Sequence, residues 1–201
     1  MANTSRVNGF RVVKHLNGSP YNGQANLYYV ASAADEILVG DQVKLSGSGD
    51  TNGIPGVDLQ TTGVPCGIVV GIMNSKFDPV GKMSTGSMTL DLPGAAQIAA
   101  SGSGYVLVAD SPDIVMEVET SNGTLSAADI GLNASIANGA RTSATVTSPA
   151  TLDAGTISTT STLNFKLLGF SQKVGNEVGA SAKVLVMFNA HQFGSVGTTG
   201  L

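Results

Sequence analysis

The fold class follows from residues 104–119, which read GYVLVADSPDIVMEVE. Two runs rich in β-branched residues, 104–109 and 114–119, flank the turn residues Asp110 to Asp113. Runs of this composition between turn residues are typical of β-strands. Pro112 presets its own φ angle, and the two aspartates can accept hydrogen bonds from turn amides. The stretch therefore predicts a β-hairpin.

Strand signals of the same kind recur on both sides of this hairpin. Residues 67–73, GIVVGIM, are apolar on both faces, which indicates a buried central strand with bends or bulges at its glycines. Residues 163–170 and 183–193 predict two strands that could pair as a wide hairpin. Shorter strand signals lie at 26–31, 37–45 and 87–92.

Helix signals are nearly absent. Residues 126–132, SAADIGL, carry the one good helix start. Ser126 can cap the first turn, and the side chain of Asp129, three residues later, can complete a capping box with it. Residues 95–100 fit a helical turn or a strand, and residues 138–162 fit a long β loop or an edge hairpin. The Gly- and Ser-rich residues 46–56 predict a surface loop.

These signals predict an all-β fold. With about eight to twelve short strands and no internal repeat, we expect a barrel or sandwich of short antiparallel strands with at most one short helix. Closely spaced Asn-Gly turns predict an irregular, extended N-terminal arm over residues 1–26. Residues 27–194 would form the β-rich domain, with a separate β subregion around 134–162 as an option, and 195–201 a flexible tail.

The composition excludes several partners. Only 12% of the 201 residues are charged, against about 25% in ordinary domains, and Gly, Ser, Thr and Asn take their place. The net charge is −4 and the basic residues are scattered, so nucleic acid is not expected to bind. No segment approaches the roughly 20 apolar residues of a membrane span, and the N-terminus lacks an apolar signal core. Cys66 lies in an apolar run, which indicates a buried, inert thiol.

Residues for catalysis are few. The chain has two histidines, His15 and His191, and lacks the serine-elbow, phosphate-loop and zinc-ligand spacings. We therefore expect no enzyme, no cofactor and no metal. The carboxylates between Asp110 and Glu119 fit either a calcium site or turn chemistry beside a solvated strand face, and the missing EF-hand spacing favours the second interpretation.

Several motifs, taken in their order along the chain, resemble one family. They are VNGFRVVKHLNGSPY at 7–21, VGDQVKL at 39–45, GIVVG at 67–71, ADSPD at 109–113, AADIGLN at 127–133 and NAHQF at 189–193. In this order they resemble the capsid decoration (cement) proteins of tailed bacteriophages. The resemblance implies a β-rich module that binds the outer capsid shell, usually as a symmetric oligomer, and clamps neighbouring capsomers. It brings no catalytic residues with it.

This resemblance implies partners and a location. The expected partners are the major capsid protein and further copies of the chain, with a trimer favoured, on the capsid exterior of a virion assembled in the host cytoplasm. We expect Phe10, Arg11, His15 and Tyr21 to contact the capsid or another subunit, because they are polar-aromatic groups on the arm. The alternatives are a tail or collar component, or a glycan- or calcium-binding module built on the 110–119 hairpin. An enzyme would instead be marked by a convergent His–carboxylate pocket.

Overall fold

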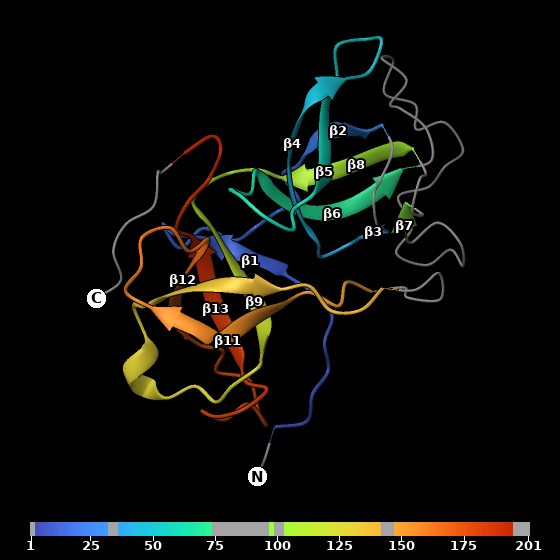
Figure 1. The fold of residues 1–201 in the computed structure, drawn as a ribbon. Helices are drawn as coiled ribbons and strands as arrows, with labels where there is room; N and C mark the ends of the chain where they lie inside the picture. Colours follow the sequence, from blue (N-terminus) through green and yellow to red (C-terminus); the bar gives the residue numbers. More distant parts are fainter. Residues whose placement is uncertain (1–2, 32–35, 74–96, 99–102, 142–146, 195–201) are drawn as a thin grey trace.

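The computed structural model describes residues 3–31, 36–73, 97–98, 103–141 and 147–194 (Figure 1). Its regular structure is almost entirely β-strand, which confirms the predicted fold class. The elements are β1 Arg11–His15, β2 Asn26–Val30, β3 Ile37–Leu38, β4 Gln42–Gly49, β5 Pro55–Leu59, β6 Gly67–Met73, β7 Gln97–Ile98, β8 Gly104–Ala109, β9 Ile114–Ser121, the 3-10 helix η1 Ala127–Asp129, β10 Asn133–Ala137, β11 Thr151–Ser158, β12 Phe165–Phe170 and β13 Lys183–Phe188. The strand predicted at 87–92 and the tail at 195–201 lie outside the described residues.

Five strands close a small barrel in the order β2-β5-β4-β6-β8, here called the first barrel. In β8, Val106 and Val108 are fully buried while Tyr105 and Leu107 are only half-buried, because alternate residues of a strand point to opposite faces. The core of this barrel contains Tyr28, Val30, Ile37, Val43, Val57, Leu59, Cys66, Val69, Ile72, Val106 and Val108.

The remaining long strands form a six-stranded sheet in the order β1-β9-β11-β10-β12-β13. An additional pairing between β9 and β13 brings this sheet back onto itself, so we call β9 to β13 the second barrel. Its core is built around Met116, Val118, Leu152, Phe165, Val186 and Phe188. Figure 1 shows the two barrels as separate halves of the molecule.

The predicted hairpin at 104–119 is wrong in its pairing. Both strands exist, and a turn joins them, since the amide of Ile114 donates to the carbonyl of Ser111 at 3.4 Å. However, β8 pairs with β2 and β6 in the first barrel, whereas β9 pairs with β1, β11 and β13 in the second. The turn is therefore the crossover between barrels. The pairing predicted for β12 and β13 is confirmed, with Phe165 opposite Phe188.

The central strand β6 serves both cores, which explains why its sequence is apolar on both faces. Ile68 packs in the core of the second barrel, and Val69 and Ile72 pack in the core of the first. An irregular register between Val69 and Gly71 fits the bulge expected at the glycine.

Polar side chains also join the barrels. Arg141 donates to both carboxylate oxygens of Asp41, from Nη1 at 2.6 Å and from Nη2 at 3.0 Å. The hydroxyl of Ser148 and the amide of Leu38 donate to the same carboxylate. Asp41 is fully buried and the Arg141 side chain is 6% exposed. This ion pair holds the segment after β10 against the turn before β4.

The N-terminal segment, predicted as an irregular, extended arm, wraps its own molecule in the structure. Strand β1 pairs antiparallel with β9, and Phe10 stacks on Phe165 with ring centroids 4.7 Å apart. Further upstream, the hydroxyl of Ser5 and the amide of Arg6 donate to the buried carboxylate of Glu119. Residues 5–15 are therefore part of the second barrel's structure, and deleting them would expose its core.

Two loop predictions also differ from the structure. Residues 46–56 form the end of β4, a turn closed by Asp50, and the start of β5, because the Asp50 carboxylate accepts the amides of Asn52 and Ile54. Strand β11 pairs with both β9 and β10, so it is an inner strand and not an edge.

The predicted helix start is confirmed as one turn, with the Ser126 amide donating to Asp129 at 2.7 Å. In the described part of the chain, no helix has the length and apolar character that crossing a bilayer requires.

Substituting Gly9 with alanine should destabilise the fold. Gly9 has a φ of +70°, and a Cβ atom there would lie 2.7 Å from the carbonyl oxygen of Gly40. We expect the free energy of unfolding to fall by about 2–5 kcal/mol, from left-handed strain plus overpacking. Gly18→Ala is the matched control, because Gly18 has a φ of +89° with nothing within 4 Å. Equal effects of the two substitutions in urea denaturation would contradict the close approach.

Candidate functional site

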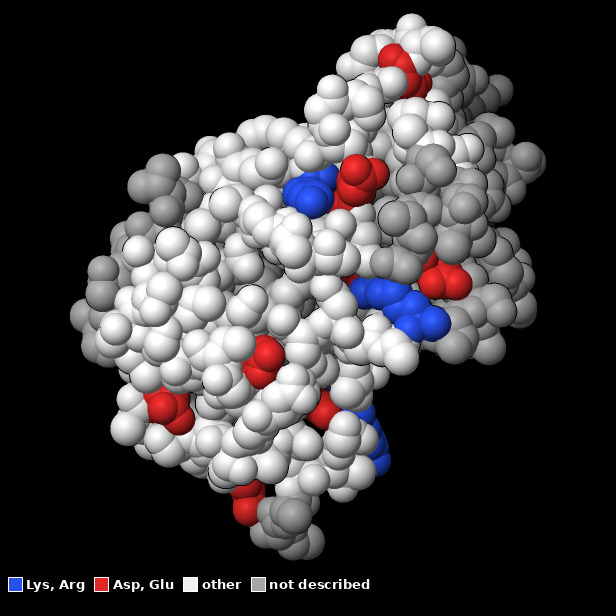
Figure 2. Space-filling model, viewed as in Figure 1, with Lys and Arg blue, Asp and Glu red and all other residues white. Residues whose placement is uncertain are grey.

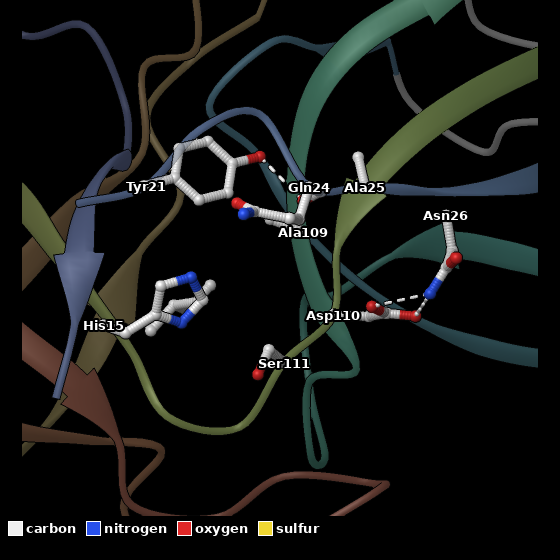
Figure 3. A pocket seen from close by; sticks show the side chains of 9 residues that line it. His15, Tyr21, Gln24, Ala25, Asn26, Ala109, Asp110 and Ser111 are labelled. Atoms are coloured by element: carbon white, nitrogen blue, oxygen red, sulfur yellow. Dashed lines mark hydrogen bonds between the residues drawn. The ribbon is translucent and has the colours of Figure 1, made fainter. Parts of the chain in front are cut away.

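A pocket of about 230 Å³ opens at the crossover between the two barrels (Figure 3). One wall comes from the N-terminal segment, and the other comes from the end of β8 and the turn that follows it. Its lining residues are His15, Tyr21, Gln24, Ala25, Asn26, Ala109, Asp110, Ser111 and Ile114. The pocket exists because β1 pairs with β9 while β2 pairs with β8, which brings both ends of residues 15–26 beside the crossover turn.

His15 stands at the end of β1, opposite Ile114. Its Nδ1 atom lies 3.4 Å from Oδ1 of Asp113, and the Ser111 hydroxyl donates to that same oxygen. The hydrogen bond from Ser111 is the main reason why the pKa of Asp113 is lowered; burial opposes it and His15 adds to it. An ionised Asp113 can only accept, so Nδ1 of His15 is the donor and Nε2 of a neutral ring is an acceptor.

Tyr21 supplies the aromatic wall of the pocket. Its ring lies 6.2 Å from the ring of His15, and its hydroxyl donates to the carbonyl of Gln24 at 2.9 Å. Burial, and then the charge of Asp110, raise the pKa of Tyr21. The hydroxyl therefore stays protonated at neutral pH and serves as a hydrogen-bond donor.

Asp110 is the charged residue of the opposite wall. Its carboxylate accepts hydrogen bonds from the Asn26 amide at 3.0 and 2.9 Å and from the Tyr28 hydroxyl at 2.6 Å. Both donors are neutral, and Asp110 forms no ion pair with any residue of the described chain. Burial, with the hydrogen bond and charge of Asp110 after it, raises the pKa of Tyr28.

The serine and the histidine at the pocket are not hydrogen-bonded to each other. A His–carboxylate pair does lie at the pocket, but the Ser111 hydroxyl donates to Asp113 and not to His15. Across the described ranges, no hydroxyl is hydrogen-bonded to the His15 ring. Nucleophilic catalysis by serine requires that contact, since histidine must take the hydroxyl proton.

The carboxylates predicted as a possible cation site do not converge. Within the residues that the structure describes, no group of three or more His, Cys, Asp or Glu side chains could hold a metal ion. Glu117 accepts from Lys173 at 2.6 Å and from Ser171 at 2.6 Å, and these bonds lower its pKa although burial opposes them. Glu117 and Glu119 are 6% and 2% exposed, so the strand face expected to be solvated is buried.

The structure brings together two of the four predicted contact residues. His15 and Tyr21 both line the pocket. Arg11 is exposed on β1, opposite Glu117. Phe10 is 3% exposed in the core of the second barrel, so its assignment to an outer contact is incompatible with its burial. No local sequence pattern joins Asn26 to Asp110; the antiparallel pairing of β2 with β8 places them together.

His191 and Cys66 are buried, and neither lines the pocket. Nδ1 of His191 accepts the amide of Phe193 at 3.1 Å, and the ring packs 4.7 Å from that of Phe188. Cys66 is a free, fully buried thiol whose pKa burial raises to about 12, so the predicted inert thiol is confirmed.

Lowering the pH should destabilise the fold through His191. Burial lowers the pKa of His191 below its ordinary 6.5, and the Cys66 backbone and the Asp110 charge offset only part of the shift. The histidine is therefore protonated at a higher pH in the unfolded chain than in the folded chain. As a result, the free energy of unfolding falls as the pH drops below about 6.5, by at most about 1.4 kcal/mol per pH unit. The slope between pH 7 and 5 should flatten in His191→Gln and persist in His15→Gln. An unchanged slope in His191→Gln would contradict this assignment.

The visible face of the molecule is mostly uncharged, and several of its few lysine and arginine side chains lie next to an acidic side chain (Figure 2). Exposed large apolar side chains include Leu16 at 54% and Phe193 at 52%. Both border the crossover turn, since the Leu16 amide donates to the carbonyl of Asp113 and Gly194 packs against Pro112. Comparison with family models, with curated proteins and with solved structures finds no match.

Proposed function

We propose that this chain is a structural virion protein that decorates the outer capsid shell of a tailed phage and bridges neighbouring capsomers. The observation that carries the proposal, beside the resemblance of its sequence motifs, is the two-barrel architecture with apolar anchors at the junction. Two cores linked by one shared strand and a buried ion pair form a rigid body. A clamp must be rigid, because ordering a flexible segment on binding costs affinity.

The surface chemistry supports the same role. A neutral polar surface avoids the cost of desolvating charges when it is covered by a partner. Leu16 and Phe193 are exposed apolar groups suited to burial by a partner, and Leu16 directly follows His15, which lines the pocket. Weak contacts of this kind, repeated by a symmetric oligomer over a shell, gain strength through multivalency.

The proposal is tested by the copy number of this chain relative to the major shell protein in purified virions, measured by quantitative mass spectrometry. A ratio near one, or a simple fraction that fits icosahedral axes, is the expected result. A few copies per particle would point instead to a tail or collar component and would reject the decoration role. Absence from the virion would reject both.

Changing Leu16 to glutamate should weaken attachment to shells stripped of this protein by about tenfold or more, because a charge would replace an interface anchor. The substitution leaves both cores intact, since Leu16 is 54% exposed. Ile130→Glu is the matched control, because Ile130 is 44% exposed beside η1, away from the crossover turn. Co-sedimentation with shells measures the effect. Equal binding of the two variants would show that Leu16 is not part of the contact surface.

A further inference from the structure

We propose that the pocket at the crossover turn binds the guanidinium group of an arginine side chain from a partner protein, held between the Asp110 carboxylate and the Tyr21 ring. Figure 3 shows Tyr21 and Asp110 on opposite sides of the pocket, with His15 on the side of Tyr21 and with the Asp110 carboxylate turned toward Asn26. The proposal rests on the function above only for the source of the arginine, the shell protein. The pocket chemistry stands without it.

The first argument is the charge of Asp110. Among the residues that the structure describes, its hydrogen-bond donors are the neutral Asn26 amide and Tyr28 hydroxyl. By contrast, two buried carboxylates have cationic partners: Asp41 has Arg141 and Glu117 has Lys173. Asp110 is thus a partly buried carboxylate whose charge no residue of the described chain neutralises. A cation that entered the pocket would supply the missing partner.

The second argument is the set of acceptors that remain free. An ionised carboxylate has about four acceptor positions. Oδ2 of Asp110 receives Asn26 and Tyr28, whereas Oδ1 receives Asn26 alone, so Oδ1 can take one more N–H group. Nε2 of a neutral His15 is a second acceptor, because Nδ1 is directed at Asp113. A guanidinium carries five N–H donors in a planar fork, which suits acceptors in separate positions.

The third argument is shape. The pocket volume of about 230 Å³ lies below the roughly 300–1,000 Å³ of drug-sized ligand sites, so it fits one side chain better than a metabolite. Aromatic faces attract arginine through cation–π contact, and arginine stacks flat on them better than lysine does. The Tyr21 ring, half-buried and held by its hydrogen bond to Gln24, offers such a face.

The test is a titration of the full chain with N-acetyl-arginine amide, followed by two-dimensional amide NMR. We expect saturable shifts confined to residues around Tyr21 and Asp110. The neutral, isosteric N-acetyl-citrulline amide should bind about tenfold or more weakly, since a hydrogen bond to a charged group would be replaced by a neutral one. Putrescine and N-acetyl-lysine amide distinguish a free diamine or an ammonium from the guanidinium, and both should bind more weakly than the arginine probe.

Two variants locate the site. Asp110→Asn should abolish the difference between the arginine and citrulline probes, while Asp58→Asn, which removes the same charge from a residue outside the pocket, should preserve it. Tyr21→Leu, which keeps the carboxylate, should also weaken binding of the arginine probe. This variant tests the site if Asp110→Asn fails to fold. Equal binding of arginine and citrulline, tighter binding of lysine or putrescine, or no shifts at all would overturn the proposal. Arginine binding without attachment to shells would support the pocket and reject the proposed function.

Discussion

Replacing Arg141 with methionine should lower the free energy of unfolding by about 3–5 kcal/mol, which is one of the two largest effects expected of a single substitution in this chain. The guanidinium of Arg141 donates to both oxygens of Asp41, and Asp41 is fully buried. Without it, the carboxylate keeps only the Ser148 hydroxyl and the Leu38 amide. A buried charge left without a counter-ion is far more costly than the pair itself.

Urea denaturation measures this effect as a lower midpoint at constant slope. The double variant Asp41→Asn/Arg141→Met should be more stable than Arg141→Met alone, because asparagine carries no charge, its oxygen can accept from the Leu38 amide and its NH2 group can donate to the Ser148 hydroxyl oxygen. Arg11→Met is the matched control, since Arg11 is exposed on β1, and it should change stability by under about 0.5 kcal/mol. Additive effects in the double variant would show that the pair is not coupled.

Replacing Phe165 with alanine should lower the free energy of unfolding by about 3–5 kcal/mol, because it removes a fully buried ring that contacts two other phenylalanine rings. The Phe165 ring lies 4.7 Å from that of Phe10 and 5.5 Å from that of Phe188. Phe10 would lose the ring on which it stacks. We therefore expect β1 to lose protection in amide hydrogen exchange more than β13 does, since β1 is an edge strand that pairs with β9, whereas β13 pairs with both β9 and β12.

Phe193→Ala is the control for this experiment. Phe193 is 52% exposed, so its removal should change the free energy of unfolding by less than about 0.5 kcal/mol. A cost below about 1 kcal/mol for Phe165→Ala would mean that the second barrel can collapse onto the cavity. Unchanged exchange in β1 would mean that pairing with β9, and not the stack of Phe10 on Phe165, holds the N-terminal segment.

The fold class and most strand positions could be predicted because they depend on local patterns. The apolar run at β6 and the alternation in β8 identify strands whatever their partners are. The capping pair of Ser126 and Asp129 identified the one helical turn in the same way, because both residues lie within four positions. Burial of Phe10 and of Glu119 could not be read from those patterns, since their partners lie more than a hundred residues away.

The candidate site was predictable only in part. His15 and Tyr21 were selected as polar-aromatic groups of the N-terminal segment, and both line the pocket. The sequence places Asp110 in the turn after residues 104–109, and it lies there in the structure. That Asp110 and Tyr21 line the same pocket depends on which strands pair. Nothing in the local sequence distinguishes a turn that closes a hairpin from one that crosses between barrels, because both need the same dihedral angles.

The sequence by itself thus determined that this protein is built of short β-strands joined by tight turns, with few charges and one helical turn. Only the tertiary structure decided that β8 and β9, which are joined by the turn that follows Asp110, belong to different barrels. The physical reason is that strand formation is set by neighbours along the chain, whereas pairing is set by which distant edges and apolar faces can be buried together. The pocket, the buried ion pair of Asp41 with Arg141 and the packing of Phe10 all follow from that choice of partners.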